Sequence, residues 1–146
     1  ELAQSGMDFT TVVDQVSRYI NEMQTYFVLE TLDNLRKAGR LTRVQSIVTG
    51  ALHIKLLMGA TPEGEICKKG QAMSVKQALN KMVALMADDL KHVGKRLSIV
   101  HCNCLERAFY VKELAMKQCR FDEILVSDTG GISTMYANDG GIVVAY

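Results

Sequence analysis

SVKQALNKMVALMADDLKHVGKRLSIVHC is the sequence of residues 74–102, and it carries the plainest structural signal in the chain. Ser74 followed by Gln77 is a capping-box pair, which predicts the start of a helix. Apolar residues then recur at helical spacing, at positions 75, 78, 79, 82, 83, 86, 90 and 93. Gly94 predicts the end of this helix, and an apolar strand is predicted directly afterwards, over 97–102. A capped amphipathic helix that leads into a strand is typical of an α/β protein.

The segments on both sides of this stretch alternate between the same two patterns. Further helices are predicted over 12–23 behind Asp8 or Thr10, around Leu32 and Leu35, over 44–52 behind Thr42, and over 103–118 behind Asn103. Strands are predicted over 26–29, 54–58, 65–69, 124–126, 132–136 and 142–146. Residues 61–64, with Pro62 and Gly64 at turn positions, indicate a hairpin between the second and third of these strands. We therefore predict an α/β fold, a two-layer mixed β-sheet with helices packed on it.

Composition excludes several classes of function. Of the 146 residues, 48% are hydrophobic and 23% charged, and the net charge is +1. Since the 17 basic residues are dispersed among 16 acidic ones, nothing favours binding to nucleic acid. No apolar run approaches the roughly 20 residues that span a bilayer, so we expect no membrane-spanning segment. Four cysteines and no secretory leader favour a cytoplasmic protein with reduced thiols.

One cluster of residues invites a chemical interpretation. His101, Cys102 and Cys104 are three potential metal ligands, but neighbouring strand residues point to opposite faces and no second pair completes a tetrahedral set. Cys104 at a helix start could be a nucleophile, yet nothing in the sequence identifies a base for it. An enzyme that uses Cys104, His101 or Asp139 remains an alternative. The favoured interpretation is structural, with no metal, no cofactor and no catalytic residue.

Two glycine-rich turns and the methionines are the remaining candidates for a binding site. Gly130-Gly131 and residues 138–141 could present backbone amides to an anion, or could simply be tight turns between strands. Neither turn is followed by the Lys and Ser/Thr of a nucleotide-binding loop. The eight methionines could line a site for an acyl chain or fill an ordinary core.

Several segments, taken in order, resemble the DegV family. Residues 27–41, FVLETLDNLRKAGRL, are similar to its leucine-rich helix that ends in a Gly-Arg step. Residues 50–57 resemble its next segment, where the family usually reads Ile-Lys-Pro. Residues 64–66 are similar to its hairpin strand and residues 99–101 to the end of its Ile-x-His strand. Residues 136–141 resemble a variant of the terminal His-x-Gly-Pro-Gly element, so the resemblance covers essentially the whole chain.

The resemblance implies a lipid-binding role. Proteins of this family have two domains with a long-chain fatty acid between them, and some carry the acyl group to a separate ATP-dependent fatty acid kinase subunit. It implies that residues 1–24 are the last helix of a preceding N-terminal domain or a lead-in. Residues 25–146 would then form the C-terminal α/β domain. A regulatory or interaction module that binds another small ligand or a protein remains the alternative.

The resemblance also selects candidate ligand-binding residues, which are Tyr136, Asn138, Asp139, Gly140, Arg40 and Ile54. The chain departs from the family pattern at four positions. Tyr136 replaces the terminal His, Asp139 replaces the Pro of Gly-Pro-Gly, Met73 replaces an Arg, and Leu56 replaces the Pro after Ile-Lys. These changes leave the ligand's head group open.

Overall fold

The computed structural model describes residues 2–41, 54–89 and 92–146, and every structural statement below refers to these residues. They form, in order, η1 (Leu2–Ser5), α1 (Phe9–Glu22), β1 (Thr25–Val28), α2 (Asp33–Lys37), β2 (Lys55–Ala60), β3 (Ile66–Ala72), α4 (Val75–Asp88), β4 (Arg96–His101), α5 (Leu105–Gln118), β5 (Glu123–Asp128), α6 (Gly131–Ala137) and β6 (Ile142–Ala145). The helix predicted over 44–52 lies entirely outside the described residues, which end at Leu41 and resume at Ile54.

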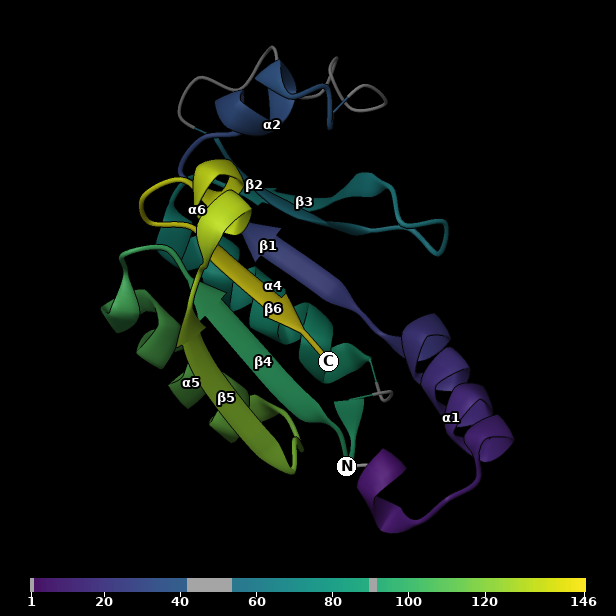
Figure 1. The fold of residues 1–146 in the computed structure, drawn as a ribbon. Coiled ribbons are helices and arrows are strands. Elements are labelled where there is room, and N and C mark those ends of the chain that lie inside the picture. Colours follow the sequence, from purple (N-terminus) through teal and green to yellow (C-terminus); the bar gives the residue numbers. More distant parts are fainter. Residues whose placement is uncertain (1, 42–53, 90–91) are drawn as a thin grey trace.

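The strands form one mixed sheet in the order β3-β2-β1-β6-β4-β5 (Figure 1). All neighbours are antiparallel except β4 and β5, which are parallel and joined through α5. The chain returns from β5 through α6 to insert β6 between β1 and β4 at the centre of the sheet. The predicted mixed sheet with packed helices is confirmed, and so is the hairpin, which is β2 and β3.

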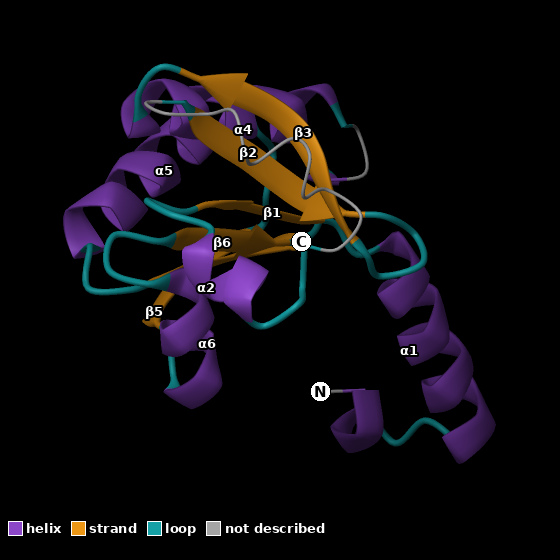
Figure 2. Cartoon of the chain, turned by 90° about the horizontal axis from the view of Figure 1, so that it is seen from above, coloured by secondary structure: helices purple, strands orange, loops and turns teal. Residues whose placement is uncertain are grey.

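One face of the sheet is covered by α4 and α5, which pack on each other and on the strands (Figure 2). Because side chains alternate along a strand, every second residue of β1, β4 and β6 points to this face. The main core contains Tyr26, Val28, Leu97, Ile99, Ile142 and Val144 from the strands and Leu79, Met82, Val83 and Met86 from α4. We call the face of the sheet beneath α4 and α5 the covered face.

Among residues 2–41, 54–89 and 92–146, the helices on the opposite face are α2 and α6, which lie together over one end of the sheet (Figures 1 and 2). Asn34 of α2 donates from Nδ2 to the carbonyl of Met135 on α6 at 2.7 Å, which holds the two short helices together. A second, smaller apolar cluster lies beneath them: Leu29, Leu32, Leu35, Leu41, Leu56, Met58, Cys102 and Ala137. We call the face of the sheet that carries α2 and α6 the open face.

The helix starts agree with the capping patterns. Asp8 accepts a hydrogen bond from the Thr11 amide at 3.0 Å, and Ser74 Oγ accepts one from the Gln77 amide at 3.2 Å. Gln77 in return accepts from the amide of Met73 rather than from that of Ser74. These contacts satisfy amides that a helix start leaves without an intrahelical partner.

The strand predicted over 132–136 is wrong, because residues 131–137 form α6. The β-branched Ile132 and Thr134 suggested a strand. The segment is helical because its turn lets Thr134 Oγ1 reach the Thr129 side chain at 2.8 Å and places Ala137, 4% exposed, in the second cluster. Tertiary packing outweighs a weak local preference here.

Two helix boundaries also differ from the prediction. Helix α4 ends at Asp88, short of Gly94, and Asp89 accepts a hydrogen bond from the Tyr146 hydroxyl at 3.2 Å. Asn103 does not cap α5, whose N-cap is Cys104 without a side-chain hydrogen bond. Asn103 instead adopts a left-handed backbone (φ 51°) and donates from Nδ2 to Asp139 at 2.8 Å.

Candidate functional site

The open face contains an apolar cavity of about 200 Å³ next to α6. Its walls come from β1, β3, β6, α2 and α6. The lining residues are Phe27, Leu29, Leu35, Ile66, Ser133, Tyr136, Ala137 and Val143. Ligand pockets usually have volumes of roughly 300–1,000 Å³, so this one is the size of a part of a ligand rather than of a whole one.

Strand alternation explains why this cavity is apolar. Phe27 of β1 and Val143 of β6 are cross-strand partners in the antiparallel ladder, so their side chains lie together on the open face. Their neighbours Tyr26, Val28 and Val144 point to the covered face and belong to the main core. The two central strands are therefore apolar on both faces, although the helices of the described part of the chain cover only one face along its whole length.

The turn between α6 and β6 directly follows Ala137 of the cavity wall. Asn138 and Gly140 both have positive φ, of 57° and 80°. The Gly140 amide donates to the Cys102 carbonyl at 2.9 Å, and the Cys102 amide donates to the Gly141 carbonyl at 2.9 Å. A Cβ on Gly141 would lie 2.5 Å from the Ala137 carbonyl oxygen. Backbone packing therefore requires glycine here, and the structure favours the tight-turn interpretation of residues 138–141.

Three charged side chains, those of Glu30, Lys55 and Arg107, support this turn through two ion pairs and a hydrogen bond. The Arg107 guanidinium donates from Nη1 to the Gly140 carbonyl at 2.7 Å and contacts Glu30 Oε1 at 2.6 Å. The Lys55 ammonium contacts Glu30 Oε2 at 2.5 Å and donates to the Glu30 carbonyl at 3.0 Å. The network thus connects α5, β2 and the end of β1 to the α6–β6 turn.

Glu30 is the central member of this network. Burial opposes its ionisation, but the hydrogen bonds and charges of Lys55 and Arg107 outweigh that effect and lower its pKa below the ordinary value. The carboxylate therefore stays ionised at neutral pH. Because Glu30 forms ion pairs with both Lys55 and Arg107, the two cations contribute to the folded structure.

The candidate ligand-binding residues fall into three places. Tyr136 lines the cavity, and both Tyr136 and Ile54 pack against the second apolar cluster. Asn138, Asp139 and Gly140 form the turn beside it; the Gly140 amide is already engaged, and Asp139 is exposed and accepts from Asn103. Arg40 is exposed, and its backbone amide closes the end of α2 on the Leu35 carbonyl.

The geometry around Cys104 does not activate its thiol. Burial raises the pKa of Cys104 despite the nearby Arg107, and Sγ donates to the Gly141 carbonyl at 3.4 Å. His101 is buried, and its Nδ1 lies 3.4 Å from the Cys104 amide, which donates to it, and 3.4 Å from Asp128. A thiol with a raised pKa is a poor nucleophile at neutral pH.

The described part of the chain contains neither a cluster of metal-ligating side chains nor a membrane-spanning helix. No group of three His, Cys, Asp or Glu side chains there is arranged to hold a metal ion. Within residues 2–41, 54–89 and 92–146, no helix has the length and apolar character needed to cross a membrane. All four cysteines are free thiols.

Sequence reasoning identified Tyr136 and the neighbouring turn but missed the Glu30–Lys55–Arg107 network. The three residues are far apart in the sequence, and no spacing rule brings them together. Phe27 and Val143 were within predicted strands, so their alternation could have placed them on one face. Nothing in that pattern shows which face the helices leave open.

Comparison with known proteins gives a consistent result. The family model described as DegV, an uncharacterised protein family, matches residues 1–146. A curated relative, a DegV domain-containing protein of Streptococcus pyogenes serotype M1, is 28% identical over 145 residues, which cover 99% of this chain and 51% of the relative. The chain therefore spans about half the length of the curated relatives it matches.

Solved structures agree with the family model. A crystal structure of a DegV-family protein from Ruminococcus gnavus, refined with vaccenic acid, is 49% identical to this chain, with a TM-score of 0.93. The match covers 99% of this chain and 52% of that protein. The fatty acid kinase B3 protein of Streptococcus pneumoniae, loaded with linoleic acid, is 25% identical with a TM-score of 0.80, over 99% of this chain and 51% of its own.

Proposed function

This chain belongs to the DegV family, and we propose that it binds the acyl chain of a long-chain fatty acid as part of a longer polypeptide. The observation that carries this proposal is the apolar cavity on the open face, between α6 and the central strands. The 49% identical Ruminococcus gnavus protein, whose structure contains vaccenic acid, supports the choice of ligand. The described helices cover this face of the sheet only at one end, through α2 and α6.

Binding energy in this proposal comes mainly from the acyl tail. Each methylene removed from water contributes about 0.8 kcal/mol, so a few methylenes among Phe27, Tyr136 and Val143 already give substantial affinity. The cavity is too small for a whole long-chain fatty acid. The rest of the tail would lie along the open face and under the part of the polypeptide outside these residues.

The head group would lie at the rim of the cavity. Tyr136 and Asn138 are the side chains we propose as hydrogen-bond donors there, because both belong to α6 or to its C-terminal cap. Gly140 contributes by shaping the turn, since its own amide donates to Cys102. Asp139 repels a carboxylate, and Ile54 and Arg40 would contact the ligand only from the periphery of the second cluster.

The surrounding assembly follows from the same proposal. Residues 25–146 form the C-terminal α/β domain, and residues 1–24 belong to the last helix of, or the connection from, a second domain. Because the pneumococcal neighbour is a fatty acid kinase B3 protein loaded with linoleic acid, we propose that the complete polypeptide presents its fatty acid to a separate ATP-dependent kinase subunit rather than reacting with it. Four free thiols favour the reducing cytoplasm as its compartment.

Native mass spectrometry of the native-length polypeptide after gentle extraction tests this function. We expect a bound long-chain fatty acid, and we expect Ser133→Phe to reduce its content at least about tenfold, because the new ring enters the cavity. Ile132→Phe is the matched control: Ile132 is on the same helix, 71% exposed, and does not line the cavity. Ligand-free protein throughout, or equal loss in both variants, would contradict the proposal.

A further inference from the structure

Helix α5 exposes a stripe of apolar side chains that neither the described helices nor the described strands cover. Its buried side faces the main core through three short side chains: Ala108, Val111 and Ala115. The stripe lies beside them and contains Leu105, Phe109 and Met116, which are 50%, 48% and 66% exposed. Lys112 belongs to the same stripe by helical spacing, and its aliphatic stem extends it between Phe109 and Met116. Several large apolar side chains in a row on one helix indicate an interface.

The stripe continues into a hollow between the C-terminal half of α5 and the start of β5. The hollow has a volume of about 310 Å³. Its lining combines apolar side chains with charged ones: Met116, Phe121 and Ile124 with Lys112, Asp122 and Glu123. A hollow of this kind can receive one apolar side chain of a partner, as interface pockets receive anchor residues.

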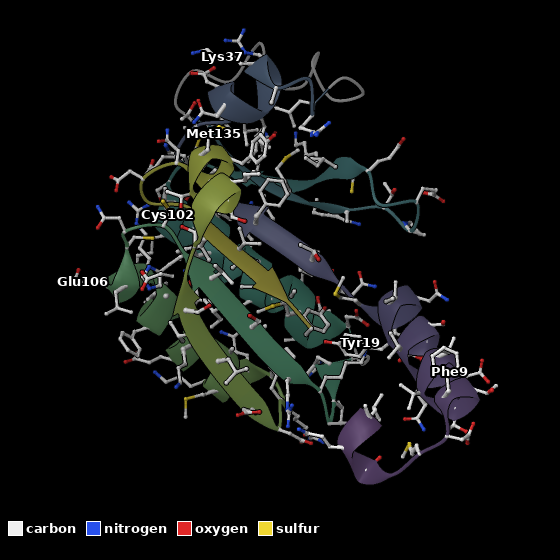
Figure 3. All side chains as sticks on the ribbon, viewed as in Figure 1. Phe9, Tyr19, Lys37, Cys102, Glu106 and Met135 are labelled. Carbon is white, nitrogen blue, oxygen red and sulfur yellow. The ribbon has the colours of Figure 1, made fainter. Side chains whose placement is uncertain are left out.

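The stripe lies on the opposite side of the molecule from α1. In both Figure 1 and Figure 2, α5 and β5 lie at one side of the sheet and α1 at the other. Figure 3 labels Glu106, which is next to the stripe, at the outer edge of the molecule. Under the proposed function, a second domain connects through residues 1–24 and the acyl chain occupies the open face. Neither of these accounts for exposed apolar side chains on α5.

Charged residues beside the stripe help to identify what covers it. Glu106, Glu113 and Lys117 lie along one flank, because intervals of seven and four residues return to the same side of a helix. All three are exposed, and within the described ranges neither Glu106 nor Lys117 forms an ion pair. Helices that lie on lipid surfaces are usually rich in Lys and Arg, so two glutamates on this flank disfavour a membrane.

Two copies of this helix, packed antiparallel, would pair both unpaired charges. A twofold axis level with Val111 brings the same flank of each helix together and reverses its direction. Residues equally far before and after Val111 then lie at the same level. Glu106 is five positions before Val111 and Lys117 is six positions after it. The two charges therefore lie within about 1.5 Å of helix rise of one level, and the axis generates this ion pair twice.

The same register also pairs the apolar residues. Leu105 comes level with Met116 of the second copy to within one residue, and it therefore adjoins the hollow of that copy. Phe109 comes level with Lys112 to within one residue, where the ring and the ammonium can form a cation–π contact. One arrangement thus pairs the charges, fills the hollow and covers the stripe.

We propose that α5 packs antiparallel against α5 of a second copy, so that the native-length polypeptide forms a homodimer with twofold symmetry. A helix of 14 residues is about 21 Å long, so a single pair of such helices forms a small interface. Specific interfaces of standard size bury roughly 1,200–2,000 Å², and this one lies at or below the lower end. We therefore expect a dissociation constant in the micromolar range.

Sedimentation velocity of the native-length polypeptide tests the proposal, at protein concentrations from about 1 to about 100 μM. We expect the monomer to convert to a dimer across this range. Phe109→Glu, in the middle of the stripe, should raise the dissociation constant at least about tenfold, because it places two carboxylates near the axis. Ile132→Glu is the matched control: this residue is 71% exposed on α6, outside the stripe, and its substitution should leave dimerisation unchanged.

An exchange of charges tests the register itself. Glu106→Lys alone should raise the dissociation constant about threefold to tenfold at low salt, because a lysine then faces Lys117 of the second copy. Lys117→Glu alone should have the same effect. The double variant reverses the ion pair and should restore the original dissociation constant. Both residues are exposed, so these variants give a result even where Phe109→Glu prevents folding.

Three results would overturn the proposal. A monomer at every concentration would mean that no second copy covers the stripe. A dimer that Phe109→Glu leaves intact would use another surface. A double charge variant no better than either single variant would exclude the antiparallel register. Protein with and without bound fatty acid should dimerise alike, so a failure here differs from a failure of the proposed function.

Discussion

The covered face and the open face of the sheet use the same strands for different purposes. On the covered face, Leu97, Ile99 and Ile142 are completely buried beneath α4 and α5. On the open face, the alternate residues Phe27 and Val143 are only partly buried and line a cavity. One face thus provides most of the buried core of the fold, whereas the other keeps partly buried apolar surface, where we propose that the acyl chain binds.

The largest expected effect comes from damage to the covered face. Met82→Ala should lower the free energy of unfolding by about 2–5 kcal/mol, because Met82 is fully buried in the main core. Val143→Ala on the open face should cost about 1 kcal/mol or less, since it removes less apolar area from a half-buried site. Urea denaturation followed by circular dichroism measures both. Equal losses would erase the distinction between the two faces.

The second effect concerns the turn at the edge of the open face. Gly140→Ala should destabilise the protein by about 1–3 kcal/mol, because of its positive φ and because a Cβ would lie 2.6 Å from Arg107 Nη1. Gly64→Ala is the matched control: Gly64 has nearly the same φ, 81°, but a Cβ there meets nothing within 4 Å. Thermal unfolding should show the larger loss for Gly140. Equal losses would mean that Arg107 does not brace the turn.

The smallest effect is a pH dependence of the same brace. Because the pKa of Glu30 is lowered in the folded protein, its contribution to stability is complete above the ordinary value of 4.5 and is lost as the pH falls through the folded value. Glu30→Gln should therefore lower stability at neutral pH by up to about 1 kcal/mol and flatten the loss in acid. Urea denaturation from about pH 6 to about pH 3 measures the difference. Parallel curves for the two proteins would contradict this role.

The covered face could be predicted from the sequence more fully than the open face. The apolar stripe of α4 and the Ser74 cap have a strong local signal, and alternation in β1, β4 and β6 follows from strand geometry. Helix α6 was predicted as a strand because its seven residues are too few for a clear helical pattern and include the β-branched Ile132 and Thr134. Its conformation depends on contacts with α2 and with Thr129, which no local pattern contains.

The candidate site shows the same division. Tyr136 was identified through the resemblance of residues 136–141 to the family's terminal element, and the glycines of the turn because clustered glycines are typical of tight turns. Glu30, Lys55 and Arg107 were not, because ordinary surface-type charges become a half-buried network only after β1, β2 and α5 are assembled. Sequence reasoning thus found the rim of the cavity, while the residues that support the rim required the fold.

The most direct test of the central claim is a methyl NMR titration of the native-length polypeptide with vaccenic acid. We expect the Val143 methyl resonances to shift on addition of the fatty acid, together with those of Leu29, Leu35 and Ile66 in the cavity wall. Methyl resonances of Leu79 and Val83, in the core of the covered face, should stay unchanged. Shifts confined to the covered face, or no saturable shift at any methyl group, would contradict it.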